Sequence, residues 1–140
     1  MILPPPIRVL LIDASADTGA HLAAAHDLTL VGSGSSAQAL DLCLALNPDI
    51  VLFEVYAPDS STVDAIRAIR MTAPLVRVLV LSSAAEIGFT RAVLNVGASG
   101  FLLNYQDRPD LAVSLRAACR GRIVLSPVIA RALIQSDHTD

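Results

Sequence analysis

Four polar side chains stand where apolar stretches of the sequence end, and these positions are well suited to chemistry. They are Asp13, Glu54, Ser82 and Asn104. Carboxylates that share a site with hydroxyl and amide groups can bind a cation or join a hydrogen-bonded cluster. Glu54 closes an otherwise apolar run, so it either lies near the like charge of Asp13 or finds a donor such as Ser82 or Asn104. Asp13 also has a simpler interpretation as a capping or turn residue, because Asp accepts hydrogen bonds from nearby backbone amides.

Several other chemistries are excluded by the residue types and spacings of the chain. All ten basic residues are arginine, so there is no lysine for a Schiff base or a phosphate-binding loop. His21 and His26 are five residues apart, which is not the spacing that presents two metal ligands on one helix face. Cys43 and Cys119 show no metal-ligand spacing, and we interpret them as small buried side chains rather than as a disulfide.

The elements that position these side chains are predicted from short apolar runs that alternate with segments of helical periodicity. Strands are expected at about 7–12, 28–32, 49–54, 77–82 and 100–103. Helices are expected at about 15–26, 35–47, 61–73, 86–96 and 109–120. This alternation predicts an α/β fold, a flavodoxin-like (βα)5 doubly wound parallel sheet with strand order 2-1-3-4-5. Ligands of such sheets bind at the carboxyl ends of the strands, where the four polar side chains lie.

Length and composition favour one globular domain. We expect a single domain over 1–140, with its core at about 7–122 and a linker helix within 123–140. No apolar run approaches the ~18 residues that a membrane-crossing helix needs. The N-terminus lacks the basic start and apolar core of a signal peptide, so a cytoplasmic location is expected.

The net charge of −3 argues against nucleic acid as a partner of this segment alone, because phosphate backbones are bound by clustered cations. Arg116, Arg120 and Arg122 lie close together in the sequence. We interpret them as a solvated face, with an interface anchor as the alternative.

Four stretches of the chain resemble receiver domains of response regulators of the NarL/FixJ type, which precede a LuxR-type DNA-binding domain. The stretches are Ile7–Asp13, Leu46–Glu54, Arg77–Ser82 and Gly97–Asn104, and Gly121–Leu133 resembles the link to the output domain. The resemblance implies a pair of acidic residues and a phosphoacceptor Asp that bind Mg²⁺. It also implies a Ser or Thr and a Lys that hold the phosphoryl oxygens.

The chain departs from that pattern at three positions. Ala14 replaces the second acid, Glu54 replaces the phosphoacceptor Asp, and Asn104 replaces the Lys. The change at Ala14 removes a carboxylate ligand of Mg²⁺, and the extra methylene of Glu54 displaces its carboxylate by about 1 Å. Asn104 carries no positive charge, and no lysine elsewhere in the chain can replace it. Phe101 matches the aromatic switch residue of the family, with simple packing as the alternative.

We therefore expect a degenerate pseudo-receiver in which only Asp13 and Ser82 keep the side chains of the family. A buried hydrogen-bonded cluster of Asp13, Glu54, Ser82 and Asn104 is expected in place of the metal site. Weak or absent Mg²⁺ binding, no cofactor, no metal site and no catalytic residue follow from this expectation, so the module is not expected to be an enzyme. Glu54 is either a fixed charge that imitates a phosphorylated or metal-free acidic site or a tolerated remnant.

A module of this kind works through protein contacts. We expect a homodimer through the fourth helix, fifth strand and fifth helix, or through the fifth helix alone, and no membrane partner. The resemblance implies that a longer parent binds DNA through a C-terminal helix-turn-helix, for which 140 residues leave no room, so an excised domain and a stand-alone module both stay open. Two other functions also stay open, a residual phosphoacceptor in a phosphorelay and a small-molecule sensor with a pocket shaped by 33–36.

Overall fold

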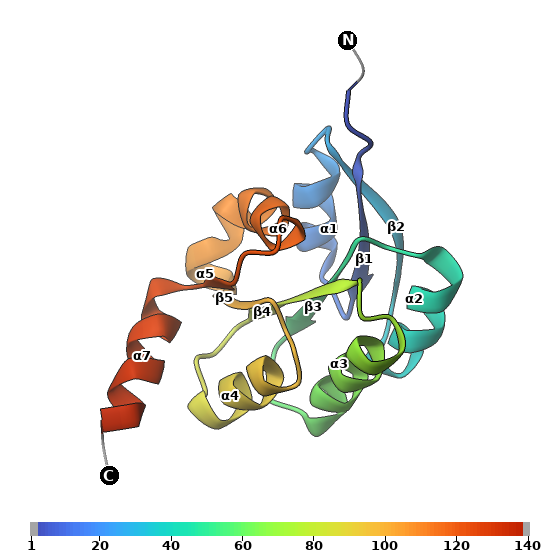
Figure 1. Ribbon diagram of the computed structural model, residues 1–140. Helices are drawn as coiled ribbons and strands as arrows, with labels where there is room; N and C mark the ends of the chain where they lie inside the picture. Colours follow the sequence, from blue (N-terminus) through green and yellow to red (C-terminus); the bar gives the residue numbers. More distant parts are fainter. Residues whose placement is uncertain (1–2, 139–140) are drawn as a thin grey trace.

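One parallel sheet organises the molecule. The structure, a computed structural model, describes residues 3–138, and the ends of the predicted 1–140 domain lie outside this range (Figure 1). Within it the strand order is β2-β1-β3-β4-β5-β6. The strands are β1 (Ile7–Ile12), β2 (Leu28–Gly34), β3 (Ile50–Val55), β4 (Arg77–Ser82), β5 (Gly100–Leu103) and β6 (Val124–Leu125). The predicted flavodoxin-like order is confirmed, and β6 extends the sheet beyond β5.

Helices cover both faces of this sheet, as a doubly wound fold requires. They are α1 (Ala16–Ala23), α2 (Ala39–Leu46), α3 (Ser60–Thr72), α4 (Ile87–Asn95), α5 (Asn104–Asp107), α6 (Leu111–Cys119) and α7 (Pro127–His138), with the short 3₁₀ turns η1 (Ser36–Gln38) and η2 (Arg108–Asp110). One apolar cluster joins the sheet to α2, α3, α4 and α7, and a second joins it to α1 and α6. The two clusters exist because successive residues of a strand point to opposite faces.

Local chemistry explains most helix boundaries. Ser15 caps α1, since its hydroxyl accepts a hydrogen bond from the Thr18 amide at 3.2 Å. Asn47 ends α2 in the left-handed conformation, with φ 49°, directly before Pro48. Gly97 follows α4 with φ 109°, a conformation that suits glycine.

Three predicted helix boundaries are wrong. The first helix ends at Ala23 rather than near residue 26. The third helix, predicted at about 61–73, begins at Ser60 because Asp59 caps it. The fifth helix, predicted at about 109–120, begins at Leu111 as α6, because Pro109 lies in the 3₁₀ turn η2 before it. The short helix α5, which precedes η2, was not predicted. The α5–η2 segment matters for the site, because it places Asn104 and Arg108 one helical turn apart.

The C-terminal segment packs onto the rest of the domain. β6 pairs with β5, and the Ser126 amide donates to the Phe101 carbonyl at 3.0 Å. Ile129 of α7 is fully buried in the cluster that also contains residues of α4. The free edge of β5 is therefore occupied by the chain's own C-terminal segment.

The remaining sequence predictions concern cysteines and membrane spans. Cys43 is buried and Cys119 is half-buried, and both are free thiols, so the prediction that they form no disulfide is confirmed. Burial raises the pKa of both thiols. No helix between residues 3 and 138 is long and apolar enough to cross a membrane.

Candidate functional site

Glu54, near the end of β3, is the centre of the candidate site. Its side chain is fully buried, and its carboxylate accepts four hydrogen bonds. Oε1 accepts from the backbone amide of Ser15 at 2.7 Å and from the Thr18 hydroxyl at 2.8 Å. Oε2 accepts from Nδ2 of Asn104 at 2.8 Å and from Nη2 of Arg108 at 2.9 Å. A buried charge is tolerated when it is paired and hydrogen-bonded in this way.

The first turn of α1 provides two of these donors. Ser15 caps the helix, which directs its own backbone amide towards the end of β3. Thr18 is completely buried, so its hydroxyl has Glu54 and Ser15 as partners instead of water. The positive end of a helix favours a carboxylate at this place.

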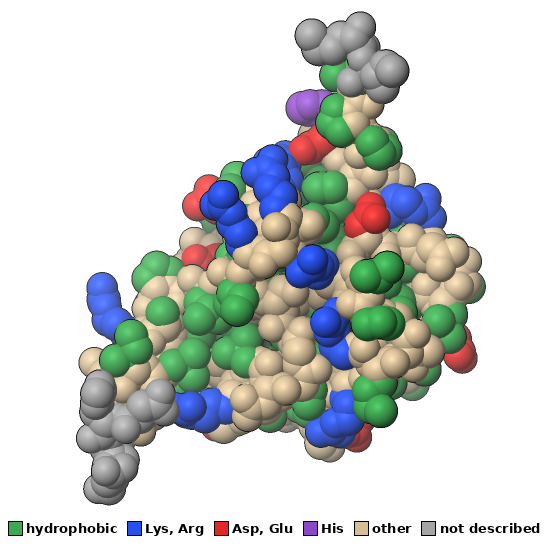
Figure 2. Space-filling model, in the orientation of Figure 1, with side chains coloured by type: hydrophobic (Ala, Val, Ile, Leu, Met, Phe, Trp, Pro, Cys, Tyr) green, Lys and Arg blue, Asp and Glu red, His purple; other side chains and the backbone are tan. Residues whose placement is uncertain are grey.

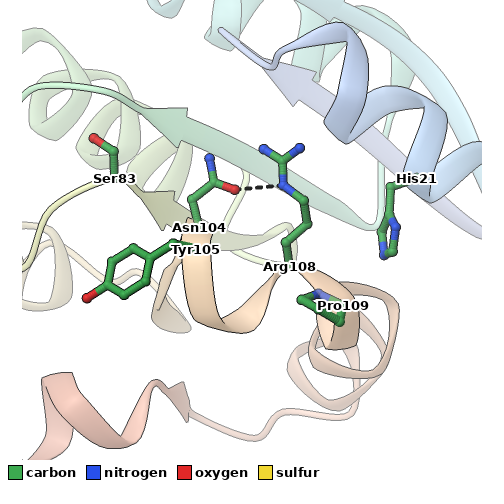
Figure 3. A pocket seen from close by; sticks show the side chains of 6 residues that line it. All are labelled: His21, Ser83, Asn104, Tyr105, Arg108 and Pro109. Carbon is green, nitrogen blue, oxygen red and sulfur yellow. Dashed lines mark hydrogen bonds between the residues drawn. The ribbon is translucent and has the colours of Figure 1, made fainter.

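The segment after β5 provides the other two donors. Asn104 and Arg108 are four residues apart, so their side chains meet on one side of the α5–η2 turn. Nε of Arg108 donates to Oδ1 of Asn104 at 2.7 Å, the hydrogen bond drawn in Figure 3. The same guanidinium forms the ion pair with Glu54 and is 26% exposed. An arginine thus brings the positive charge that the missing lysine does not supply.

The predicted four-residue cluster is wrong for two of its members. Asp13 is exposed and adopts a left-handed conformation with φ 56°, and its Oδ2 accepts from the Ser36 hydroxyl at 2.9 Å. The Ser82 hydroxyl is buried but donates to the Ala84 carbonyl at 2.8 Å, so its turn satisfies it locally. The predicted contact between Glu54 and Asn104 is present.

Sequence reasoning missed Thr18 and Arg108. Thr18 stands three residues after a helix cap and Arg108 one turn after Asn104, spacings that place both side chains at the carboxyl edge of the sheet. These spacings could have indicated both residues. The residue types alone could not, because Thr and Arg are too common to suggest a functional site. Ser36 belongs to the stretch 33–36 that the sequence predicts to shape a pocket, but its hydrogen bond to Asp13 was not predicted.

Metal-binding groups are sparse near Glu54. Ala14 lies in the loop after β1 with no oxygen in its side chain to offer. Among the described residues, no three His, Cys, Asp or Glu side chains are grouped as a metal site. The expected weakness of Mg²⁺ binding stays a prediction.

Phe101 lies on β5 in the interior of the domain rather than at the surface. Its side chain is fully buried, and its ring stands edge-to-face to Phe89 of α4, with 6.1 Å between the ring centres. This arrangement joins β5 to α4. The structure holds one position of the ring, so its role as a switch stays a prediction.

Two hollows open beside the site. The larger, of about 630 Å³, is lined by His21, Ser83, Asn104, Tyr105, Arg108 and Pro109. Figure 3 shows the Arg108 guanidinium between the Asn104 amide and the imidazole of His21. The second, of about 520 Å³, has Asp13, Ser35 and Ser36 in its wall, where the sequence predicts a pocket after the second strand.

Curated proteins with similar sequences are regulators of transcription or response regulators. The chain is 30% identical over 115 residues to the transcriptional regulatory protein DegU of Brevibacillus brevis, covering 81% of this chain and 49% of DegU. It is 27% identical over 128 residues to the response regulator protein VraR of Staphylococcus aureus, covering 88% of this chain and 61% of VraR. The chain thus spans about half to three-fifths of the length of these relatives. No family model matches it.

Solved structures agree with this similarity. The signal receiver domain of NarL from Mycobacterium tuberculosis superposes with a TM-score of 0.76 at 27% identity, covering 85% of this chain and all of that domain. A LuxR-family two-component response regulator from Aurantimonas sp. SI85-9A1 shares the fold with a TM-score of 0.83 at 23% identity, covering 94% of this chain and 98% of that one. Sequence and structure together support the identification of this chain as a response-regulator receiver domain of the NarL/LuxR type.

Proposed function

We propose that this receiver domain is a cytoplasmic regulatory module that works without phosphorylation and without enzymatic activity. The observation that carries the proposal is the environment of Glu54, the residue at the phosphoacceptor position. Its carboxylate is buried and accepts four hydrogen bonds, one of them from Arg108. The site is thus filled by an internal ion pair.

This environment makes Glu54 a poor nucleophile. A carboxylate oxygen that attacks phosphorus must present a free lone pair to the phosphodonor, but both oxygens of Glu54 are hydrogen-bonded and out of contact with solvent. The longer side chain adds a displacement of about 1 Å, which can lower a rate by about 10²-fold. Ala14 offers no carboxylate to a metal that would polarise the donor.

The same contacts favour the fixed-charge interpretation of Glu54 over that of a tolerated remnant. From its place near the end of β3, Glu54 joins the segment after β1 to the segment after β5 through Ser15, Asn104 and Arg108. A remnant without a role would not require donors from two separate parts of the chain. We infer that the ion pair between Glu54 and Arg108 holds the carboxyl edge of the sheet in one conformation at all times.

The domain would then act on other proteins through direct contacts. We propose a homodimer formed through α6, whose Val113 is 59% exposed. We also propose that a longer parent protein regulates transcription through a DNA-binding domain, since DegU is a transcriptional regulatory protein and this chain matches 49% of its length.

A small-molecule sensor is the second candidate, supported by the hollow of about 520 Å³ beside Asp13, Ser35 and Ser36. Hydroxyl and carboxylate groups in its wall suit a polar metabolite. A thermal-shift screen of metabolites tests this candidate, and stabilisation that Ser36→Ala removes would support it.

Intact-mass measurement after incubation with acetyl phosphate and Mg²⁺ tests the main proposal. We expect no phosphoryl adduct on the natural chain. The matched control is the triple variant Ala14→Asp, Glu54→Asp, Asn104→Lys, which restores the residues of the family pattern and should gain the adduct. An adduct on the natural chain that Glu54→Gln removes would contradict the proposal and support a residual phosphoacceptor.

A further inference from the structure

The edge of the sheet where the strands begin, opposite the Glu54 site, carries a concentration of arginines. The members of this basic edge are Arg8, Arg70, Arg77, Arg116, Arg120 and Arg122. They begin β1 and β4 or lie at the ends of α3 and α6. Asp27 and Asp49 are the acids nearby, although the chain as a whole has a net charge of −3. Figure 2 shows basic side chains gathered between α6 and α3.

Half of these arginines have structural partners. Arg116 forms a two-pronged ion pair with Asp27, with 2.7 Å between Nη2 and Oδ1, and this hydrogen bond raises the pKa of Arg116. Arg8 donates to the Leu46 carbonyl at 2.6 Å, and Arg70 donates to the Val76 carbonyl at 2.7 Å. Carbonyl groups satisfy the donors of Arg8 and Arg70 but do not neutralise their charges.

The other three, Arg77, Arg120 and Arg122, make no side-chain hydrogen bond or ion pair within residues 3–138. Nη2 of Arg77 lies 3.6 Å from the point where a Cβ of Gly121 would stand, which places this guanidinium beside the turn between Arg120 and Arg122. Cations on neighbouring segments concentrate positive charge at this edge, which favours an anionic partner.

Apolar groups lie among these cations. A hollow of about 310 Å³ is lined by Arg116 and Arg120, and a neighbouring one of about 300 Å³ is lined by Arg77 and Leu75. Both hollows share Ile7 and Cys119 in their walls, so they adjoin. Leu75 is 91% exposed, so the second hollow offers an apolar side chain beside Arg77.

We propose that the basic edge is a docking surface for an acidic protein segment that also carries apolar side chains. The planar fork of a guanidinium binds a carboxylate through two hydrogen bonds, and Arg is among the residues that dominate protein interfaces. A nucleic-acid backbone would use the charges but not Leu75 or Ile123, which is 75% exposed in the segment after Arg122. The mixture of cations and apolar side chains therefore favours a protein.

Fluorescence anisotropy with a labelled peptide of four Asp-Glu-Leu repeats tests this proposal on the full chain. We expect the peptide to bind at low salt and the triple variant Arg77→Ser, Arg120→Ser, Arg122→Ser to weaken binding about tenfold or more. The matched control is Arg67→Ser with Arg131→Ser, two exposed arginines that are not members of the basic edge, which should change the affinity less than about twofold. The surface double variant Arg120→Ser, Arg122→Ser provides the same test should the triple variant fail to fold.

Two further probes separate a protein partner from other anions. Four Asp-Glu-Ser repeats keep the charge but lose the apolar groups, and we expect them to bind more weakly than the leucine peptide. A labelled 20-base-pair duplex DNA should bind more weakly still. The proposal is overturned by a leucine peptide that does not bind, by equal affinity in the triple and control variants, or by DNA that binds more tightly than the peptide.

Discussion

At the scale of single residues, Glu54 is stable in the interior because donors surround it. Burial of a carboxylate costs several kcal/mol unless hydrogen bonds and a counter-charge replace the lost water. Thr18 and the Ser15 amide serve one oxygen, and Asn104 and Arg108 serve the other. Arg108 contributes the counter-charge, so its removal should be more harmful than that of an exposed arginine.

We predict that Arg108→Ala lowers the free energy of unfolding by about 2 to 3 kcal/mol, since it leaves Glu54 buried with three neutral donors. Urea denaturation followed by circular dichroism measures this. Arg67→Ala is the matched control, because Arg67 pairs with Asp64 on the exposed face of α3 at 3.1 Å. This substitution should lower the free energy of unfolding by less than about 1 kcal/mol.

A double-mutant cycle of Arg108→Ala with Glu54→Gln shows whether the lost stability comes from the ion pair. The neutral amide that this substitution introduces does not need a counter-charge, so the double variant should lose less stability than the two single variants together. Strictly additive losses would mean that Arg108 stabilises the domain through packing instead.

Cys119 gives a second prediction at this scale. Burial and the nearby charge of Asp49 raise its pKa to about 11. At pH 8 its thiolate fraction is then on the order of one part in a thousand, about a hundredfold below that of an ordinary thiol. We expect slow reaction of the folded chain with Ellman's reagent at pH 8 and faster reaction as the pH rises towards 11. Full reactivity in guanidinium chloride is the control, and a fast thiol in the folded chain would contradict this prediction.

Residue types showed only part of the site in advance. Glu54 and Asn104 could be selected because a polar residue after an apolar strand is uncommon, and their contact is present in the structure. Asp13 and Ser82 satisfied the same criterion but bond elsewhere. The reason is geometric, since the left-handed backbone of Asp13 and the tight turn after Ser82 set directions that a sequence pattern does not specify.

At the scale of elements, the five strands were predictable because buried parallel strands are continuous apolar runs. The short strand β6 has too few residues to show a periodicity, and only the family resemblance of Gly121–Leu133 to a strand-like link and helix pointed to it. The short helix α5 was missed, because no apolar pattern indicates it. It lies directly after β5, where the C-terminal segment joins the sheet.

Gly100 makes this junction possible, which gives a prediction for the element. A Cβ at position 100 would lie 2.1 Å from the Val124 carbonyl oxygen, so Gly100→Ala should push β6 away from β5. We expect a loss of about 1 to 3 kcal/mol in stability, as for other overpacked sites. Hydrogen exchange should show faster exchange at the amides of Val124 and Ser126, which donate to β5 and the residue before it.

Gly19→Ala is the matched control for that experiment. Gly19 lies within α1, and a Cβ there would meet Leu11 at an ordinary contact distance of 3.8 Å. The substitution should stabilise the domain by about 0.5 to 1 kcal/mol, because Ala favours the helix more than Gly. Unchanged exchange at β6 in Gly100→Ala would show that β6 does not depend on close approach to β5.

At the scale of the whole molecule, the two ends of the sheet differ in charge and in how far their charged side chains are paired. The carboxyl edge holds a neutralised ion pair, whereas the side chains of Arg77, Arg120 and Arg122 at the opposite edge make no hydrogen bond or ion pair among the described residues. Between these edges, β6 and α7 cover the side of the sheet beyond β5. A partner for the α4–β5 surface would therefore have to displace α7, whereas the outer face of α6 needs no rearrangement.

We predict that the chain self-associates through α6 and that Val113→Asp weakens the dimer about tenfold or more, since it places a charge in an apolar contact. Light scattering coupled to size exclusion over a range of concentrations measures the dimer fraction. Met71→Asp is the matched control, because Met71 is 78% exposed on α3, away from the proposed interface. A natural chain that stays monomeric at high concentration, or a dimer insensitive to Val113→Asp, would exclude α6 as the interface. A dimer that appears only when Ile129→Asp loosens α7 would place the interface on the α4–β5 surface instead.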